Sequence, residues 1–281
     1  METVISPTWE QLIIDDDVHT IVVIGESDTG KSTLARYLFA RLCKAGVRAA
    51  YLDADVGQST LGLPTTQTVA LASEAGDGTF PPGGACASFF LGDVTPRGHL
   101  LPTVVGARRL ADQARAWGAG VTVVDTTGLV DPAQGGKALK QWKIELLAPE
   151  LVVALQRERE LEPILWPLRR DGRVRVAELP VVPQVRRRSR EARIAHRESR
   201  LARYFAGART QTVNLRRTAV YDLGRLAPGA LLAFQDVAGL VLALGVVDSA
   251  DRAGGTAQVR TPLKSLEAVA SLRIGVARWE R

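Results

Sequence analysis

Gly25-Glu-Ser-Asp-Thr-Gly-Lys-Ser32 is the stretch of the sequence that decides the fold. It matches the pattern G-x-x-x-x-G-K-[ST], whose glycines let the backbone wrap a phosphate chain with its N–H groups. The β-branched run Thr20–Ile24 precedes it, and a helical pattern from Lys31 to about Ala45 follows it. This order predicts a nucleotide site, with Lys31 between the β- and γ-phosphates and Ser32 on Mg²⁺. The residues predicted to bind the nucleotide here are Gly25, Glu26, Ser27, Asp28, Thr29, Gly30, Lys31 and Ser32.

Between residue 20 and about residue 180, short β-branched runs alternate with helical patterns. The predicted strands are Thr20–Ile24, Val47–Asp53, Ala85–Leu91, Gly120–Asp125, Glu150–Leu155 and Arg173–Leu179. Helices are predicted over residues 31–45, 106–117 and 137–147. Continuous apolar strands separated by helices indicate a mostly parallel sheet with helices on both faces. With the phosphate-binding loop, this pattern predicts an α/β fold of the P-loop NTPase class.

After Gly207 the sequence changes to short alternating runs separated by turns, which predict a small β-rich unit. The predicted strands of this unit are Val213–Leu215, Ala219–Asp222, Ala230–Gln235, Leu240–Val247 and Gln258–Thr261. We therefore expect an extension over residues 1–18, a P-loop domain over 19–207 and a C-terminal domain over 208–281.

Composition excludes several classes of protein. Apolar residues make up 46% of the 281 residues, which is too many for a disordered chain. Two cysteines, Cys43 and Cys86, and three histidines argue against a disulfide framework or a structural zinc cluster. The first residues lack the pattern of a secretory signal, and the longest apolar stretch, Ala230–Val247, is too interrupted to span a bilayer. We therefore expect a cytoplasmic protein without a membrane partner.

The positive charge of the chain is concentrated in one segment. The net charge is +6, and the segment Arg186–Arg203 alone holds eight Arg and two Glu, which accounts for all of it. Five arginines of this segment form one stripe at helical spacing: Arg186, Arg190, Arg193, Arg197 and Arg200. A solvated helix face would carry more acidic partners, so we favour anion binding, as a lid over a nucleotide, a clamp on a polynucleotide backbone, or both.

Two acidic motifs follow predicted strands. Asp55, in Asp53-Ala-Asp-Val-Gly-Gln58, is placed to accept the proton of an attacking hydroxyl or to order the Mg²⁺ shell. In Asp125-Thr-Thr-Gly128, the aspartate suits an outer-sphere Mg²⁺ contact and Thr126 a phosphate contact. The second motif also fits a GTPase switch, but no N-K-x-D sequence follows it to recognise guanine.

These motifs together resemble the polynucleotide 5′-hydroxyl kinases related to the eukaryotic RNA kinase of pre-mRNA cleavage and tRNA splicing. The resemblance covers about residues 19–247. The motifs that carry it, in this order, are GESDTGKS (25–32), DADVGQSTLGLP (53–64), FLGDVTPRGHL (90–100), DTTGL (125–129), LQRER (155–159) and RSREARIAHRESRLARYFAG (188–207). Eukaryotic members carry a whole domain before the phosphate loop, whereas here 24 residues precede Gly25, so the resemblance implies a minimal kinase core.

The resemblance implies a role for individual residues. Lys31, Ser32 and Thr33 would hold ATP and Mg²⁺, and Asp55 would be the catalytic base. Further metal candidates are Asp53 and Asp125. The implied substrate contacts are Gln58, Thr126, Thr127, Gly128, Arg197 and Arg200, with Leu129 standing where the family has Trp. The implied lid arginines are Arg188 and Arg193, within a lid helix over residues 186–206, and Gln156 and Arg157 would lie near the nucleotide base.

The function expected from the sequence is transfer of the γ-phosphoryl group of ATP to the 5′-hydroxyl end of RNA or DNA. Two alternatives stay open: a small-molecule kinase on the same core, and a P-loop switch protein that binds a partner without kinase activity. The sequence does not choose between RNA and DNA.

Overall fold

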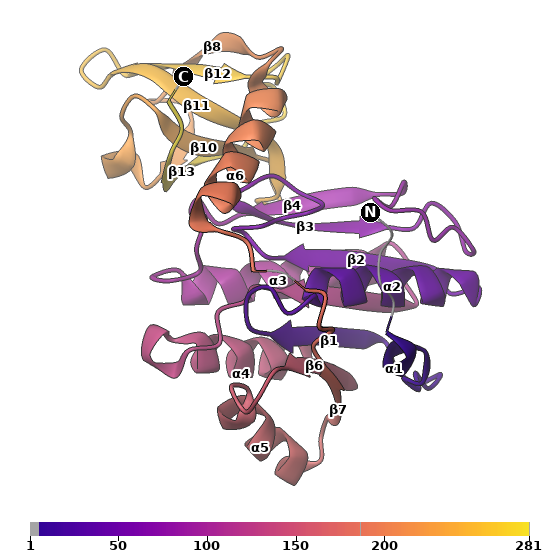
Figure 1. Ribbon diagram of the computed structural model, residues 1–281. Coiled ribbons are helices and arrows are strands. Elements are labelled where there is room, and N and C mark those ends of the chain that lie inside the picture. Colours follow the sequence, from indigo (N-terminus) through magenta and orange to yellow (C-terminus); the bar gives the residue numbers. More distant parts are fainter. Residues whose placement is uncertain (1–5, 186, 281) are drawn as a thin grey trace.

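The larger lobe is built on a seven-stranded sheet, and the computed structural model describes residues 6–185 and 187–280. The strand order is β4-β3-β2-β5-β1-β6-β7, and all neighbouring pairs within β2-β5-β1-β6-β7 are parallel (Figure 1). Their bounds are β1 Thr20–Gly25, β2 Ala49–Ala54, β3 Thr66–Leu71, β4 Cys86–Phe90, β5 Val121–Thr126, β6 Leu151–Gln156 and β7 Arg175–Pro180. The predicted α/β fold with a mostly parallel sheet is confirmed.

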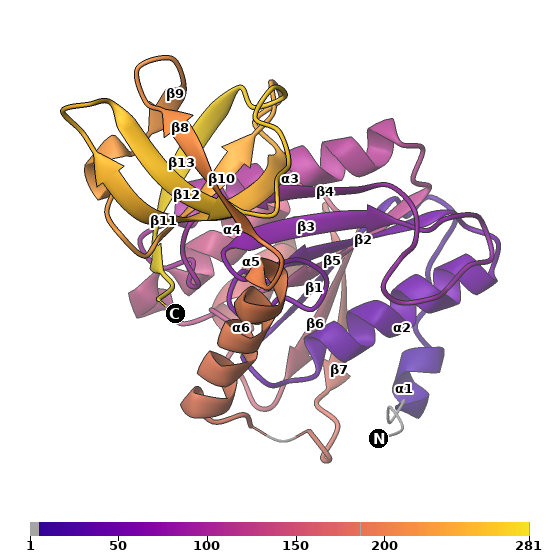
Figure 2. The ribbon, with the colours of Figure 1, turned by 90° about the horizontal axis from the view of Figure 1, so that it is seen from above.

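Helices cover both faces of this sheet (Figures 1 and 2). On one face lie α1 (Pro7–Glu10) and α2 (Lys31–Lys44), and on the other α3 (Leu100–Ala116), α4 (Gly136–Leu147) and α5 (Glu162–Asp171). Alternate residues of β1 serve the two cores, since Ile21 and Val23 pack with α2 while Val22 and Ile24 pack with the second group. Because helices cover both apolar faces of the sheet, polar side chains can form a site at the strand ends.

Three elements of this lobe were missed by the sequence prediction, namely α1, β3 and α5. Strand β3 pairs antiparallel with β2 and β4, which makes this edge of the sheet mixed. Its first half is polar but buried: the Gln67 amide donates to the Thr103 carbonyl at 3.0 Å, and the Thr68 and Ser88 hydroxyls lie 2.7 Å apart. Helix α5 contains Pro167, which sequence rules take as a helix breaker.

The smaller lobe is a six-stranded sheet in the order β8-β12-β11-β10-β13-β9. Its strands are β8 Arg209–Asn214, β9 Ala219–Tyr221, β10 Ala230–Gln235, β11 Val241–Asp251, β12 Thr256–Thr261 and β13 Ser271–Arg278. All pairs are antiparallel except β13 with β9, and β13 was not predicted. The domain boundary at residues 207/208 stays a prediction, which limited proteolysis would test.

Helix α6 (Arg190–Phe205) joins the two lobes (Figure 1). Its carboxyl half packs on the smaller lobe, where the rings of Phe205 and Trp279 stack with centroids 5.0 Å apart. The predicted start of this helix was wrong: the Ser189 hydroxyl accepts the Ala192 N–H at 3.1 Å and caps the helix there. Arg188 therefore precedes the helix, and Arg186 lies outside the described residues.

Over residues 6–185 and 187–280, no helix is long and apolar enough to cross a membrane. In the same ranges no three His, Cys, Asp or Glu side chains gather as a metal cluster. Cys43 is buried, Cys86 is exposed, and both are free thiols.

Candidate active site

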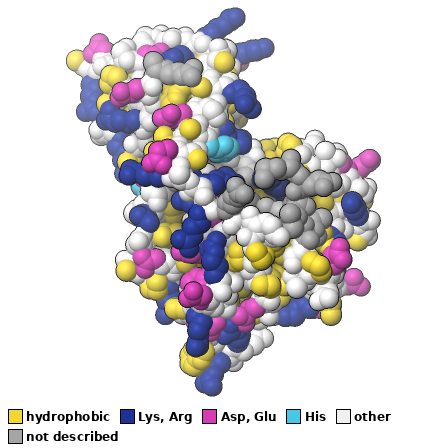
Figure 3. Space-filling model, viewed as in Figure 1, with side chains coloured by type: hydrophobic (Ala, Val, Ile, Leu, Met, Phe, Trp, Pro, Cys, Tyr) yellow, Lys and Arg dark blue, Asp and Glu magenta, His cyan; other side chains and the backbone are white. Residues whose placement is uncertain are grey.

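A cleft of about 1250 Å³ opens at the carboxyl ends of the parallel strands, the edge at which open α/β sheets bind ligands. Figure 3 shows Lys and Arg side chains gathered near the amino end of α6, where the two lobes meet. The predicted site residues that line the cleft are Glu26, Ser27, Asp28, Thr29, Gly30, Lys31, Ser32, Thr33, Asp55, Gln58, Thr127, Gly128, Arg188, Arg193 and Arg197. The fold thus brings together most of the residues predicted from separate motifs.

The loop between β1 and α2 has the geometry of a phosphate cradle. A Cβ atom on Gly25 would lie 2.6 Å from the Leu155 carbonyl oxygen, and Gly30 has φ of +90°, so both positions require glycine. The Lys31 Nζ donates to the Glu26 carbonyl inside the loop. Burial lowers the pKa of Lys31, although nearby carboxylates, Asp125 first, oppose the change. The ammonium is therefore held beside the loop backbone with little access to water.

Asp53 organises its own loop and does not line the cleft. Its Oδ2 accepts the Ser59 hydroxyl at 2.9 Å and the N–H groups of Thr60 and Leu61 at 2.6 and 2.9 Å. Its Oδ1 accepts the Asp55 N–H at 3.1 Å. Since these donors occupy both oxygens, the carboxylate is poorly placed for the predicted metal contact.

Asp125 differs from Asp53, although the two are register partners on β5 and β2. The Tyr51 hydroxyl donates to its Oδ2 at 3.1 Å, whereas its Oδ1 is buried without a hydrogen-bond partner among the described residues. Burial, reinforced by Asp53, raises the pKa of Asp125 to about 7, while the nearby Ser32 hydroxyl and Lys31 act against the increase. A buried, unsatisfied carboxylate oxygen near a hydroxyl fits Mg²⁺, which prefers oxygen ligands and usually takes only one or two from the protein.

Of the three predicted aspartates Asp53, Asp55 and Asp125, Asp55 alone lines the cleft. Its Oδ1 accepts the backbone N–H groups of Gly57 and Gln58 at 3.0 and 3.1 Å, which fixes the side chain at the end of β2. Gly57 is required here because a Cβ atom would lie 2.6 Å from the Val94 carbonyl oxygen. The loop after β2 thus packs on the loop after β4, with a carboxylate facing the cleft between them.

The four arginines predicted as lid or substrate contacts separate into two groups. Arg193 forms an ion pair with Asp28 of the phosphate loop, and the backbone N–H of Arg188 donates to the same carboxylate at 3.2 Å. Arg197 is half-buried and lines the cleft with them. Arg200 instead donates to the backbone carbonyls of residues 59–62, at distances between 2.6 and 3.4 Å, and does not line the cleft. Arg200 therefore anchors α6, and the other three face the nucleotide site.

Two further predicted residues lie behind the site. The Gln156 amide donates to the carboxylates of Glu162 and Glu178 at 3.2 and 2.9 Å, which directs it toward α5 and β7. Arg157 reaches the phosphate loop, where it pairs with the Glu26 carboxylate at 3.3 Å and donates to the Asp28 carbonyl. Neither lines the cleft, so the structure does not bring Gln156 to the site and brings Arg157 only as a support of the loop.

Thr126 also lies behind the cleft wall. It is buried, and its hydroxyl donates to the Val23 carbonyl of β1 at 2.7 Å. Its neighbours Thr127 and Gly128 do line the cleft. A Cβ atom on Gly128 would lie 2.5 Å from the Ser27 backbone nitrogen, so this loop packs directly against the phosphate loop.

Several cleft residues were not predicted. They are Trp9, Gly57, Thr60, Val94, Thr95, Pro96, Arg97, Leu129, Val130, Asp131, Pro132, Gln134, Glu160, Val182, Gln184 and Val185. Residues 94–97 belong to the motif at residues 90–100, to which the sequence analysis assigned no role. Trp9 and the segment 182–185 carry no local signal, because only the packing of distant segments brings them to this edge.

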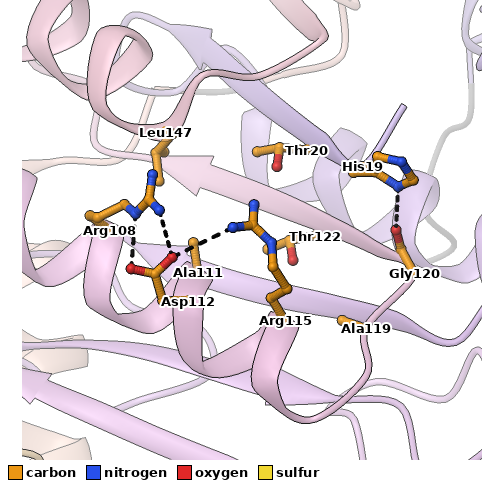
Figure 4. Close-up of a pocket in the computed structure, with 10 residues that line it drawn as sticks. All are labelled: His19, Thr20, Arg108, Ala111, Asp112, Arg115, Ala119, Gly120, Thr122 and Leu147. Atoms are coloured by element: carbon orange, nitrogen blue, oxygen red, sulfur yellow. Dashed lines mark hydrogen bonds and ion pairs between the residues drawn. The ribbon is translucent and has the colours of Figure 1, made fainter. Parts of the chain in front are cut away.

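A second cavity, of about 250 Å³, lies at the opposite edge of the sheet (Figure 4). His19 and Gly120 line it just before β1 and β5. Its two arginines are already engaged, because Arg108 pairs with Asp112 at 2.8 Å and Arg115 approaches the same carboxylate at 3.7 Å. This cavity lacks the glycine loop and the cleft carboxylate, so we place the chemistry in the larger cleft.

Comparison with known sequences relates the chain to RNA-processing proteins. A family described as "mRNA cleavage and polyadenylation factor CLP1 P-loop" matches residues 25–207. A polyribonucleotide 5′-hydroxyl-kinase of Pyrococcus horikoshii is 34% identical over 200 residues, which are 70% of this chain and 52% of that protein. Another, of Methanocaldococcus jannaschii, is 32% identical over 193 residues, with coverages of 69% and 52%. The chain spans about half the length of these curated relatives.

Comparison of structures gives the same fold. The structure of a Clp1p–Pcf11p complex matches with a TM-score of 0.72 and 15% sequence identity, over 98% of this chain and 78% of that one. This similarity extends over both lobes, whereas the family match covers the P-loop lobe and α6. The resemblance inferred from the motifs is therefore confirmed, and the chain belongs to the CLP1 P-loop family.

Proposed function

We propose that this protein is an ATP- and Mg²⁺-dependent polynucleotide kinase that transfers the γ-phosphoryl group of ATP to the 5′-hydroxyl end of RNA. The observation that carries the proposal is that the phosphate loop, the Asp55 carboxylate and three arginines of the segment 187–203 line one cleft. Phosphoryl transfer needs a phosphate cradle, a base for the acceptor hydroxyl and positive charge around the transferred group. The named activity of the archaeal relatives favours a polyribonucleotide end as the acceptor, with DNA as the comparison.

The nucleotide phosphates would bind in the loop between Gly25 and Ser32, with its N–H groups and the amino end of α2 directed at them. Lys31 would leave the Glu26 carbonyl for the β- and γ-phosphate oxygens. Ser32 and Asp125 would hold Mg²⁺, which would neutralise charge on these phosphates.

Asp55 would act as the general base. The 5′-oxygen of the acceptor forms a bond to the γ-phosphorus as the bond from this phosphorus to the ADP oxygen breaks, and the electron pair of that bond leaves with ADP. The hydroxyl proton passes to Asp55, whose Oδ1 is fixed by the N–H groups of Gly57 and Gln58. A base fixed in this way needs little rearrangement when the acceptor arrives.

Arg188, Arg193 and Arg197 would stabilise the phosphoryl group during transfer. Guanidinium groups pair with phosphate oxygens through two hydrogen bonds, which fits a group whose charge is spread over three oxygens. Arg193 is already paired with Asp28 beside the cradle, so bound nucleotide would compete with this carboxylate for the same side chain. The remaining acceptor contacts would come from Gln58 and from the loop 127–128.

The proposal is tested with radiolabelled ATP and two RNA oligonucleotides that differ only in a 5′-hydroxyl or a 5′-phosphate end. We expect label on the 5′-hydroxyl oligonucleotide alone, and loss of at least about 100-fold in kcat for Asp55→Asn. Asp17→Asn, at an exposed position, is the matched control. No transfer by the unaltered protein to RNA or DNA would refute the function, whereas normal turnover of Asp55→Asn would refute only the base.

A further inference from the structure

Helix α4 presents two fully buried lysines, Lys140 and Lys143, to the sheet face that α3 and α5 also cover. Burial of an ammonium group is unfavourable unless an anion or several hydrogen-bond acceptors compensate for the lost water. Within residues 6–185 and 187–280, neither lysine forms an ion pair with a carboxylate. The fold therefore buries two lysine side chains inside the larger lobe without an acidic partner for either among the described residues.

Lys140 supports the wall of the cleft from behind. Its Nζ donates to the Thr126 hydroxyl at 2.7 Å and to the Thr127 carbonyl. The Thr126 hydroxyl in turn donates to the Val23 carbonyl at 2.7 Å, which ties α4, the loop after β5 and β1 together. All the acceptors are neutral, and burial, reinforced by Lys143 and Lys31, lowers the pKa of Lys140 well below its ordinary value. The Lys140 amino group therefore acts as a hydrogen-bond donor directly behind Thr127, which lines the cleft.

Lys143 is more unusual, because its buried Nζ has no hydrogen-bond partner among the described residues. Burial lowers the pKa of Lys143 to about 8, and only longer-range attraction to Asp55 and Asp125 opposes this change. A methionine has similar length and would fill the same space without the desolvation penalty. An unsatisfied charge that weakens the fold is expected where it serves a site.

The loop supported by Lys140 lies against the phosphate cradle. A Cβ atom on Gly128 would lie 2.3 Å from the Ser27 hydroxyl oxygen and 2.5 Å from the Ser27 nitrogen. Thr127 and Gly128 share the cleft with Asp55, the proposed base. A phosphoryl group moving from the nucleotide to the acceptor would therefore pass between the cradle and this loop, on the far side of the wall from the Lys140 amino group.

We propose that Lys140 and Lys143 are positioning residues that favour the γ-phosphoryl group at this point of the cleft, Lys140 by holding the loop 126–128 through hydrogen bonds and Lys143 by its positive charge. Lys140 acts through Thr126 and Thr127, which it also holds in place, and Lys143 acts through its electrostatic field. The inference rests on the proposed function, because it concerns the phosphoryl group that this function transfers.

Lys143→Met is the decisive substitution, because it removes the charge without removing a hydrogen bond. If Lys143 stabilised the fold, its replacement would lower the midpoint temperature of thermal unfolding. If Lys143 instead acts through its positive charge, Lys143→Met would leave this midpoint unchanged or raise it. The variant would also bind the γ-phosphate of ATP less tightly. For Lys140 the pair Lys140→Met and Lys140→Gln separates the two contributions, since glutamine keeps N–H donors but carries no charge.

The measurement is calorimetric binding of Mg-ATP and Mg-ADP to the full chain, with a thermal unfolding scan of each variant. Two unit charges ~10 Å apart at an effective dielectric constant of about 20 attract by an energy equivalent to roughly tenfold in affinity. We therefore expect Lys143→Met to weaken ATP binding roughly tenfold, to weaken ADP binding by a smaller factor because ADP lacks the γ-phosphoryl charge, and to retain the wild-type midpoint. Lys44→Met, which removes an exposed lysine in the last turn of α2, should change none of these values.

Three results would overturn the inference: equal loss of ATP and ADP affinity, unchanged affinity for both, or a lower thermal midpoint of Lys143→Met. Equal loss of ATP affinity in Lys140→Gln and Lys140→Met would remove Lys140 from it, because N–H donors at this position would then make no difference. The ratio of the ATP and ADP affinities needs no acceptor. A protein that binds ATP but phosphorylates no oligonucleotide would therefore refute the proposed function, and the same binding data would still show whether the two lysines favour the γ-phosphate.

Discussion

Gly92 and Gly275 approach so closely that a Cβ atom on Gly275 would lie 2.5 Å from the Gly92 carbonyl oxygen. The same carbonyl accepts the backbone N–H groups of Val276 and Ala277 at 2.8 and 2.9 Å. The loop after β4 is thereby fastened to β13 of the smaller lobe, and residues 94–97 of that loop line the cleft. The smaller lobe thus supports one wall of the cleft and also carries the carboxyl half of α6.

Because the two glycines are in contact, adding a single methyl group at Gly275 should destabilise the protein. Gly275→Ala should lower the free energy of unfolding by about 1–3 kcal/mol, because the Gly92 backbone must move to make room. It should also raise the KM for the acceptor oligonucleotide, since the loop 94–97 moves with Gly92. Chemical denaturation and steady-state kinetics measure the two effects. Gly224→Ala, whose Cβ atom would meet open space, is the control, and equal behaviour of the two variants would contradict the prediction.

Arg193 faces the phosphate loop, so its replacement should act on turnover. Arg193→Gln is expected to lower kcat by at least roughly 100-fold while the KM for the oligonucleotide changes much less, because the guanidinium group neutralises charge that develops during transfer. Arg203→Gln, at an exposed position of the same helix, should retain kcat. A rise in KM at constant kcat would show that Arg193 binds the acceptor and does not serve the transfer step.

Arg200 should behave in the opposite way, although it belongs to the same stripe. It donates to four carbonyls of residues 59–62, and its removal leaves these acceptors short of partners. Arg200→Gln should lower the free energy of unfolding by about 1–3 kcal/mol and affect kcat less than Arg193→Gln does. Urea denaturation followed by circular dichroism gives the first value, and Arg190→Gln is the exposed control on α6. Normal stability with a large loss of kcat would refute the anchoring role.

The buried Asp125 predicts an unusual pH dependence of stability. Its pKa is about 7 in the folded protein because of burial beside Asp53, against an ordinary value of 3.8. Between these two pH values the folded state holds a proton that the unfolded chain releases, so the free energy of unfolding should fall as the pH rises from about 4 to about 7. Urea unfolding in Mg²⁺-free buffer measures this slope. Asp125→Asn should flatten it, and an equal slope in both proteins would contradict the assignment.

Salt distinguishes a polynucleotide acceptor from a small molecule. If about three cationic side chains of the protein replace counterions on a single-stranded acceptor, the KM for the oligonucleotide should rise with roughly the second power of the salt concentration. The KM of a small uncharged acceptor would show almost no such dependence. Initial rates at several potassium chloride concentrations, with ATP saturating, provide the measurement. A flat response would favour the small-molecule kinase over the polynucleotide kinase.

The parts of the site that follow local rules were predictable. The phosphate loop requires glycine at Gly25 and Gly30 for backbone reasons that the pattern itself carries, and Asp55 follows a strand whose carboxyl end must reach the same edge. The division of labour between Asp53 and Asp125 was not predictable. Both aspartates lie near the carboxyl end of a strand, so their sequence positions do not distinguish them. The hydrogen-bond donors show that Asp53 binds its own loop, whereas Asp125 keeps one oxygen without a partner among the described residues.

The arginine segment shows the same limit. Its charge and helical spacing were plain in the sequence, but a stripe does not tell which end of a helix overhangs a cleft. Packing of Phe205 on Trp279 sets the direction of α6, and this direction places Arg193 at the phosphate loop and Arg200 at the carbonyls of residues 59–62. Lys140 and Lys143 were not predicted for a similar reason, because no local sequence pattern distinguishes a buried lysine from an exposed one on an amphipathic helix.

By itself the sequence determined the class of fold, the nucleotide loop, the candidate base and the place of the positive charge. These depend on short-range rules: the periodicity of apolar residues, the conformational freedom of glycine and the alignment of parallel strand ends. Tertiary structure alone decided which carboxylate and which arginine face the cleft, how the smaller lobe supports the loop at Gly92, and where α4 buries its lysines. Those outcomes depend on contacts between residues far apart in the chain, which pattern and spacing do not encode.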